Sequence, residues 1–114
     1  MVGNRATGFL RTERSLFSNR RLHKRYQVKG TAKVLHGATA LDLPIRDISL
    51  SGIGLDCPGT PPLSVGNLCL VALPAHGRLD AMVVGVRSQS LHLQFLQTDS
   101  EEVRTFIEAS AGPL

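Results

Sequence analysis

The sequence contains no tryptophan, and only 4% of its 114 residues are aromatic. Aliphatic side chains must therefore form most of the core of what we expect to be one domain with a tail. The apolar run at residues 68–75 is far shorter than the ~18 residues that a membrane-spanning helix needs. The N-terminus also lacks the apolar segment of a secretory signal. We therefore expect no membrane span in this chain, and a location in the cytoplasm, alone or as the cytosolic domain of a larger membrane protein.

Cysteine and histidine are also scarce, with two and four residues respectively. Cys57 and Cys69 form no C-x-x-C pair and fall at strand-like positions, which favours buried reduced thiols over a disulfide and suits a reducing cytosol. The histidines have no metal-binding spacing, either with each other or with the cysteines. These histidines are His23, His36, His76 and His92. We therefore expect no metal site.

Motifs of catalysis are missing as well. Ser49 lies near Asp47, but no histidine is placed by the sequence to act as its base, so a catalytic triad is not indicated. Gly52 and Gly54 have neither the G-x-G-x-x-G spacing of a dinucleotide cofactor site nor the helix that follows it. The sequence thus predicts a protein that is not an enzyme and carries no cofactor.

Basic residues are concentrated at the N-terminus, although the formal net charge of the whole chain is only +4. Residues 1–30 hold eight Lys or Arg against one acidic residue, a net charge of +7, whereas the remaining 84 residues hold five basic and eight acidic groups, a net charge of −3. Residues 1–19 show no clear hydrophobic period, so we expect a flexible basic arm. Its partner should be an anion.

After the arm, apolar and polar residues alternate in a way that predicts six short strands separated by turns. The expected strands are residues 28–34, 41–45, 53–57, 68–73, 79–87 and 91–95. Pro44, inside the second strand, favours an edge or bulge position because proline has no N–H to donate. Strands of this number and spacing are typical of a small antiparallel barrel.

The hydrophobic period becomes helical only near the C-terminus. Thr98 and Glu101 fit a capping box, and apolar residues at three- and four-residue steps follow them. We expect a helix at about residues 99–109 that lays one face on the strands. The complete expectation is an all-β domain with a C-terminal helix at residues 20–110, followed by a tail at 111–114.

Two arginines, Arg21 and Arg25, form an R-x-x-x-R motif just before the first expected strand. On a helical turn they would share a face, and on an extended segment they would clamp a ligand from two sides. Guanidinium groups bind phosphate oxygens in pairs, read O6 and N7 of guanine and stack on purines. Taken alone, however, this spacing is also typical of a solvated basic segment.

A second motif, D-x-S-x-x-G, lies between the second and third expected strands and consists of Asp47, Ser49 and Gly52. Such residues are common in turns, where their side chains bond the local backbone. A carboxylate here also suits the N1 and N2 protons of guanine. Gly52 offers either a positive φ or a close approach of the backbone.

Together, the two motifs resemble those of the PilZ domain family of bacterial cyclic-di-GMP receptors, and both match in full. The resemblance extends from about residue 19 to residue 108 and includes the run DISLSGIGL at residues 47–55. It implies a six-stranded antiparallel PilZ-type barrel whose N-terminal arginine segment folds over the ligand. The ligand is cyclic-di-GMP, and binding would alter the interaction with a downstream protein partner that the sequence does not identify.

The resemblance also implies roles for individual residues. Arg21 and Arg25 would hold phosphates and guanine faces, while Asp47 and Ser49 would meet a guanine edge and the arginine segment. Gly52 would let the backbone come close. A basic residue directly before R-x-x-x-R, here Arg20, is similar to the pattern of domains that take two intercalated ligand molecules.

Two other functions remain open. The chain could be a PilZ-like interaction domain that docks to a protein without nucleotide, although the intact motifs argue against this. It could also be a small basic barrel that binds RNA, but base-stacking platforms need exposed aromatics, and Tyr26 is the sole aromatic near the arm's barrel end. We therefore expect no nucleic-acid partner.

Overall fold

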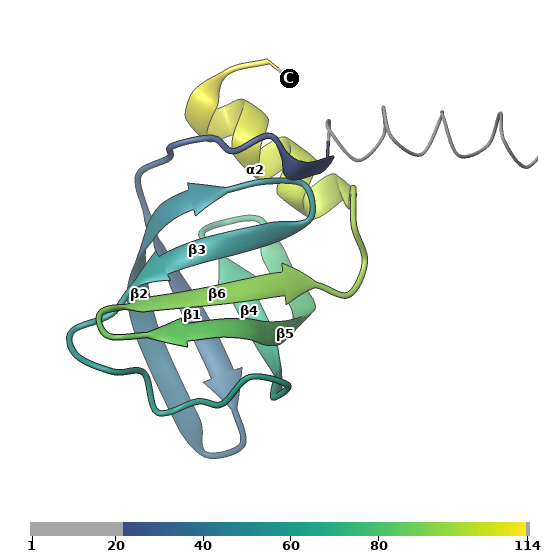
Figure 1. Cartoon of the computed structure of the whole chain (residues 1–114). Helices are drawn as coiled ribbons and strands as arrows, with labels where there is room; N and C mark the ends of the chain where they lie inside the picture. Colours follow the sequence, from purple (N-terminus) through teal and green to yellow (C-terminus); the bar gives the residue numbers. More distant parts are fainter. Residues whose placement is uncertain (1–21, 114) are drawn as a thin grey trace, which may run out of the picture.

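The computed structural model describes residues 22–113 (Figure 1). The basic arm and two of the expected site residues, Arg20 and Arg21, lie outside this range. Within it, the chain forms six strands and one longer helix. They are β1 (Thr31–His36), β2 (Thr39–Ile48), β3 (Gly52–Asp56), β4 (Leu68–Leu73), β5 (Gly77–Arg87), β6 (Ser90–Phe95) and α2 (Glu101–Ala111).

The six strands close into a barrel in the order β1-β2-β3-β6-β5-β4. Every neighbouring pair is antiparallel, including the pair of β1 with β4 that closes the barrel. Closure gives each of these six strands two partners, so within residues 22–113 the sheet has no open edge to pair with another chain. This architecture confirms the six-stranded antiparallel barrel with a C-terminal helix that the sequence predicts.

The core is aliphatic, as the shortage of aromatic residues requires. Side chains that point inward from all six strands are almost completely buried, among them Val34, Ile53 and Val83. The helix α2 lies over one end of the barrel (Figure 1) and adds Val103, Phe106 and Ile107 to the same core. Partly buried Leu22 and Tyr26, from the segment before β1, also pack against this core.

Both cysteines are buried and free of a disulfide, as the sequence favours. Burial raises the pKa of the Cys69 thiol, because a thiolate loses its solvation in an apolar core. In residues 22–113, no helix combines the length and the hydropathy that a membrane crossing requires.

The first two strands begin or end at residues that differ from the sequence expectations. The first strand begins at Thr31 and not at Val28, because Gly30 has a φ of +146° and interrupts the extended run. The second strand does not break at Asp47 but continues to Ile48.

The start of the helix also differs. It begins at Glu101, two residues later than expected, since Asp99 has a φ of 56°. The N-cap is Ser100 and not Thr98, and the Ser100 hydroxyl accepts a hydrogen bond from the Val103 N–H at 3.3 Å.

Pro44 lies in the interior of β2, in a barrel that has no edge. It nevertheless falls just outside the stretch paired with β3, which begins at Ile45, so its missing N–H breaks no rung of that ladder. A bulge does occur, but between Ile45 and Asp47. A second bulge lies in β5 between Val83 and Gly85.

Candidate functional site

The segment that carries Arg25 is fastened to the turn that carries the second motif. Tyr26 and Ile48 exchange two backbone hydrogen bonds, at 2.8 and 2.9 Å. The Ser51 N–H donates to the Leu22 carbonyl at 3.2 Å, and the His23 Nδ1 and Ser51 Oγ atoms share a hydrogen bond of 2.9 Å. Arg25 and the second motif, separated by more than twenty residues in the sequence, are therefore side by side in the fold.

The Ser49 hydroxyl shapes the turn between β2 and β3. It accepts hydrogen bonds from the backbone N–H groups of Ser51 and Gly52, at 3.2 and 3.1 Å. The Ser49 N–H in turn donates to the Gly52 carbonyl at 2.8 Å. Ser49 is only 1% exposed. Its hydroxyl thus serves the site by holding the turn in shape from inside the protein.

Arg25 joins the two motifs directly. Its Nη1 atom lies 3.5 Å from Oδ1 of Asp47 and donates a long hydrogen bond of 3.4 Å to the carbonyl of Gly52. Nearly half of the Arg25 side chain is exposed. An ion pair of this length and exposure contributes little to stability, so the exposed Arg25 guanidinium remains available to a ligand.

The Asp47 carboxylate has one oxygen without a hydrogen-bond partner. Oδ1 is buried and accepts no hydrogen bond from the described residues. Its contact with Arg25 is an ion pair and not a hydrogen bond. A buried acceptor without a hydrogen bond is unfavourable. The carboxylate is therefore suited to accept hydrogen bonds from a ligand.

Two glycines permit close packing in this region. Gly52 does not have a positive φ, and the second sequence expectation, close approach, is the one observed. A β-carbon on Gly52 would lie 2.6 Å from the carbonyl oxygen of Leu93 on β6. Gly54, two residues later, leaves the same kind of space for the Asp47 side chain, because a β-carbon there would lie 2.6 Å from Asp47 Oδ1.

The structure adds Arg46 and His92 to this face, which the motifs do not include. The Arg46 Nη2 group donates to Nε2 of His92 at 2.9 Å. Since a guanidinium has donors only, Nε2 is an acceptor, and the imidazole is neutral with its proton on Nδ1. Sequence reasoning missed both residues because the pairing of β3 with β6, which opposes Gly54 to His92, is not readable from either strand alone.

The charges around His92 show which groups share this surface. Burial, followed by the positive charges of Arg46 and Arg25, lowers the pKa of His92. The Asp47 carboxylate acts in the opposite direction, and Arg87 makes a further lowering contribution. Three arginines and one carboxylate therefore influence the charge of a single imidazole, and Arg46 contacts it directly.

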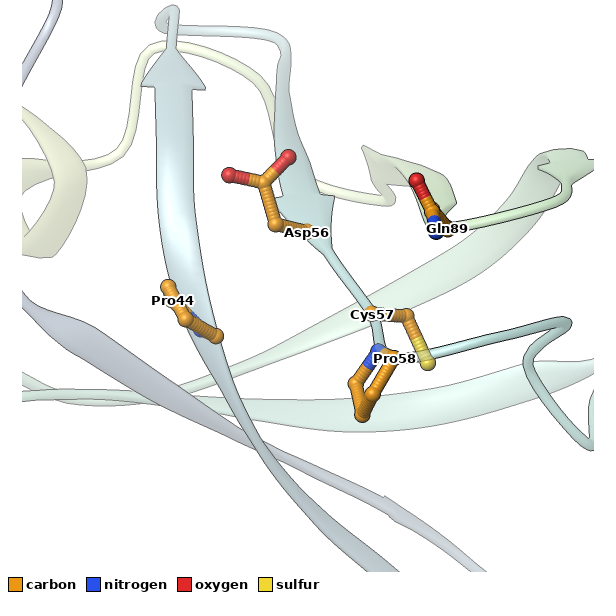
Figure 2. Close-up of a pocket in the computed structure, with 5 residues that line it drawn as sticks. All are labelled: Pro44, Asp56, Cys57, Pro58 and Gln89. Atoms are coloured by element: carbon orange, nitrogen blue, oxygen red, sulfur yellow. The ribbon is translucent and has the colours of Figure 1, made fainter.

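A pocket at the other end of β3 does not suit an anionic ligand. It has a volume of about 280 Å³ and is lined by Pro44, Asp56, Cys57, Pro58 and Gln89 (Figure 2). The one charged group among these residues is a carboxylate, which would repel a phosphate. The surface around Arg25 and Asp47 is consequently the better candidate. Among the described residues, no cluster of three or more His, Cys, Asp or Glu could hold a metal ion.

The arrangement defines a small closed barrel that carries arginine side chains beside a D-x-S-x-x-G turn. The sequence matches the family model of the PilZ domain over residues 19–111, and the chain belongs to this family of cyclic-di-GMP receptors. PilZ domains are binding domains rather than enzymes. No curated protein matches the sequence.

Among solved structures, the chain is similar to K. pneumonia MrkH in its apo state, with a TM-score of 0.52 and 23% sequence identity. The match covers 75% of this chain and 47% of that chain, so this chain spans about half the length of the matched protein. At this level of identity, the likeness supports the fold.

Proposed function

We propose that this protein binds cyclic-di-GMP and converts binding into a rearrangement of its N-terminal arm. The observation that carries the proposal is the position of Arg25, between Asp47 Oδ1 at 3.5 Å and the Gly52 carbonyl at 3.4 Å. The two motifs thereby present guanidinium and carboxylate on one surface. Guanidinium matches the two phosphates and the guanine faces of this ligand, and carboxylate matches the guanine N1 and N2 protons.

In this proposal Arg21 and Arg25 contact the phosphates and guanine bases, and Asp47 receives a guanine edge. Ser49 and Gly52 shape the turn below the ligand. Charge-assisted hydrogen bonds contribute about 1.5–3 kcal/mol each, whereas ordering a segment on binding costs about 2–5 kcal/mol. Several arginine contacts exceed this cost and a single one does not. Loss of either arginine should therefore nearly abolish binding.

The output of binding is a change in the surface that a downstream protein meets. Leu22 and His23 are hydrogen-bonded to the turn, and Tyr26 is hydrogen-bonded to Ile48 at the end of β2. We therefore place the rearrangement in the side chain of Arg25 and in the residues before Leu22, where Arg20 and Arg21 lie. The protein would act in the cytoplasm, alone or as the cytosolic domain of a larger membrane protein.

Calorimetric titration with cyclic-di-GMP tests this function. Wild-type protein should bind, and Arg25→Ala and Arg21→Ala should each lose nearly all binding. Lys33→Ala is a control of equal charge, since Lys33 lies on β1 and pairs with Asp42 at 3.4 Å. This control should bind as wild type does. Absence of binding by wild type would contradict the proposal and favour a domain that docks to a protein without nucleotide.

The proposal also covers the number of ligand molecules. If Arg20 supports an intercalated pair, wild type should bind two molecules per chain and Arg20→Leu one. An unchanged ratio in the variant would refute this role for Arg20. Titration with single-stranded RNA at two salt concentrations tests the nucleic-acid alternative, because binding through many phosphates weakens steeply as salt increases.

A further inference from the structure

Two consecutive side chains of β2, those of Arg46 and Asp47, reach the same place on the outside of the barrel. In a regular strand neighbouring side chains point to opposite faces. The bulge between Ile45 and Asp47 removes this alternation. As a result, a β-carbon on Gly54 would lie 2.6 Å from Asp47 Oδ1 and 3.3 Å from Arg46 Nη2.

His92 lies beside this place on an unusually bare part of the sheet. Its neighbours in the pairing are Gly54 on β3 and Gly85 on β5. A β-carbon on Gly85 would lie 3.4–3.7 Å from the β-carbon and ring of His92. Because both neighbours are glycines, neither of them places a side chain over the ring of His92.

The Arg46 guanidinium has a polar partner at each of its terminal nitrogens, one hydrogen-bonded and one at ion-pair distance. Nη2 donates to His92 Nε2 at 2.9 Å, and Nη1 lies 3.8 Å from Oδ1 of Asp56. Gly54 lies beneath it, yet 39% of the side chain is exposed. With Nη2 hydrogen-bonded to His92 and Nη1 directed at Asp56, the guanidinium can offer a ligand its planar face. A guanidinium face is a good surface for stacking an aromatic base.

This surface is continuous with the motif residues. Asp47 Oδ1 lies 3.5 Å from Arg25 Nη1, and the same oxygen and Arg46 Nη2 both border the space above Gly54, so the two guanidinium groups lie near one carboxylate. A cyclic dinucleotide has two bases and two phosphates to place. Arg46 presents a second guanidinium on this surface, beside Gly54 of β3 and His92 of β6.

We propose that Arg46 is a further ligand-binding arginine on which a guanine base of the cyclic dinucleotide stacks, and that His92 is the positioning residue that holds its guanidinium in place. This inference rests on the proposed function, since it names part of the site for the same ligand. Neither residue belongs to the R-x-x-x-R or D-x-S-x-x-G motif. The neutral His92 acts only as an acceptor toward Arg46 and need not touch the ligand.

Substitution of Arg46 tests the stacking role, again by titration with cyclic-di-GMP. Arg46→Ala should bind on the order of tenfold more weakly, the effect expected for loss of one stacked base. Arg46→Lys should bind as weakly as Arg46→Ala, because an ammonium keeps the charge but has no planar face. Full recovery by Arg46→Lys would overturn the stacking role. Arg78→Ala removes the same charge from a position paired with Ala72 of β4 and should bind normally.

Two substitutions of His92 test the positioning role. His92→Leu removes the acceptor for Arg46 and should weaken binding in the same direction as Arg46→Ala. His92→Gln supplies an amide oxygen as a replacement acceptor and should restore most of the affinity. A His92→Leu variant that binds as wild type does, or a His92→Gln variant that binds no better than His92→Leu, would overturn this part of the inference.

The same titrations separate this inference from the function on which it depends. Wild-type binding that is lost in Arg25→Ala but unchanged in Arg46→Ala would overturn the inference alone and leave the receptor function intact. Absence of wild-type binding would overturn both. Circular dichroism of each variant verifies the fold before titration, and thermal unfolding with excess ligand gives a second measure of affinity for any variant that is less stable.

Discussion

The carboxylate of Asp47 lies so close to the backbone of Gly54 that a β-carbon at residue 54 would approach Oδ1 to 2.6 Å. Every residue other than glycine at this position must therefore displace the Asp47 side chain. Gly54 lies outside the D-x-S-x-x-G motif, but it determines where the motif carboxylate can be.

We expect Gly54→Ala to weaken cyclic-di-GMP binding by about tenfold, the loss of one charge-assisted contact, while the barrel remains folded. The atoms in the way belong to the Asp47 and Arg46 side chains, which can move outward. Titration measures the affinity, and urea unfolding measures the stability. A variant that binds as tightly as wild type would contradict the importance of this carboxylate position.

Gly52→Ala, in contrast, should mainly lower the stability of the folded barrel. Its β-carbon would meet the backbone carbonyl of Leu93 at 2.6 Å, which cannot move without separating β3 from β6. Overpacking of this kind costs about 1–3 kcal/mol. We expect a lower free energy of unfolding in Gly52→Ala than in Gly54→Ala, measured by urea unfolding under the same conditions. Equal stability of the two variants would show that β6 yields more easily than the structure indicates.

The helix cap offers a prediction in which sequence and structure disagree. The sequence pattern predicts Thr98 as the capping residue. In the structure the cap is Ser100, which is buried and whose hydroxyl accepts the Val103 N–H. Ser100→Ala should lower the free energy of unfolding by about 1 kcal/mol. Thr98→Ala is the matched control and should change it little, because residue 98 is exposed. Thermal unfolding of both variants decides between the two residues, and a larger effect at Thr98 would restore the original expectation.

The sequence was sufficient for the barrel because alternation is a local signal. Buried apolar residues recur at every second position of a strand, and this period indicates which face is buried. Val34, Leu55 and Leu93 are examples, each two positions from another buried apolar residue. The boundaries were less predictable because they depend on single backbone angles. Gly30, with a φ of +146°, delays the start of the first strand, and Asp99, with a φ of 56°, delays the start of the helix. Composition does not reveal either angle.

The parts of the site made by residues close together in the sequence were predictable. The parts made by residues that meet across neighbouring strands were not. The D-x-S-x-x-G motif could be read directly, since Ser49 bonds backbone groups only two and three residues away. Arg46 and His92, in contrast, are 46 residues apart in the sequence. Their contact depends on a bulge in β2 and on the register of β3 with β6, and both are set by the closed barrel.

His92 also gives stability a dependence on pH. Its pKa in the folded protein lies below the ordinary value of 6.5, first because burial disfavours the charged ring and then because Arg46 and Arg25 repel it. The unfolded chain therefore binds a proton at His92 more readily than the folded chain does. The stabilising contribution is fully present above pH 6.5 and is lost progressively as the pH falls toward the lower folded pKa.

His92→Gln removes this titration while keeping an acceptor for Arg46. Urea unfolding at pH 7.5, 6.5 and 5.5 should show that wild type loses more stability than the variant between the upper and the lower pH. The difference should be modest, because solvent still reaches part of the ring, and it should shrink in high salt as the arginine charges are screened. If wild type and His92→Gln lose stability in parallel over this range, the imidazole is not held neutral by its arginine neighbours, and Arg46 must be oriented by another group.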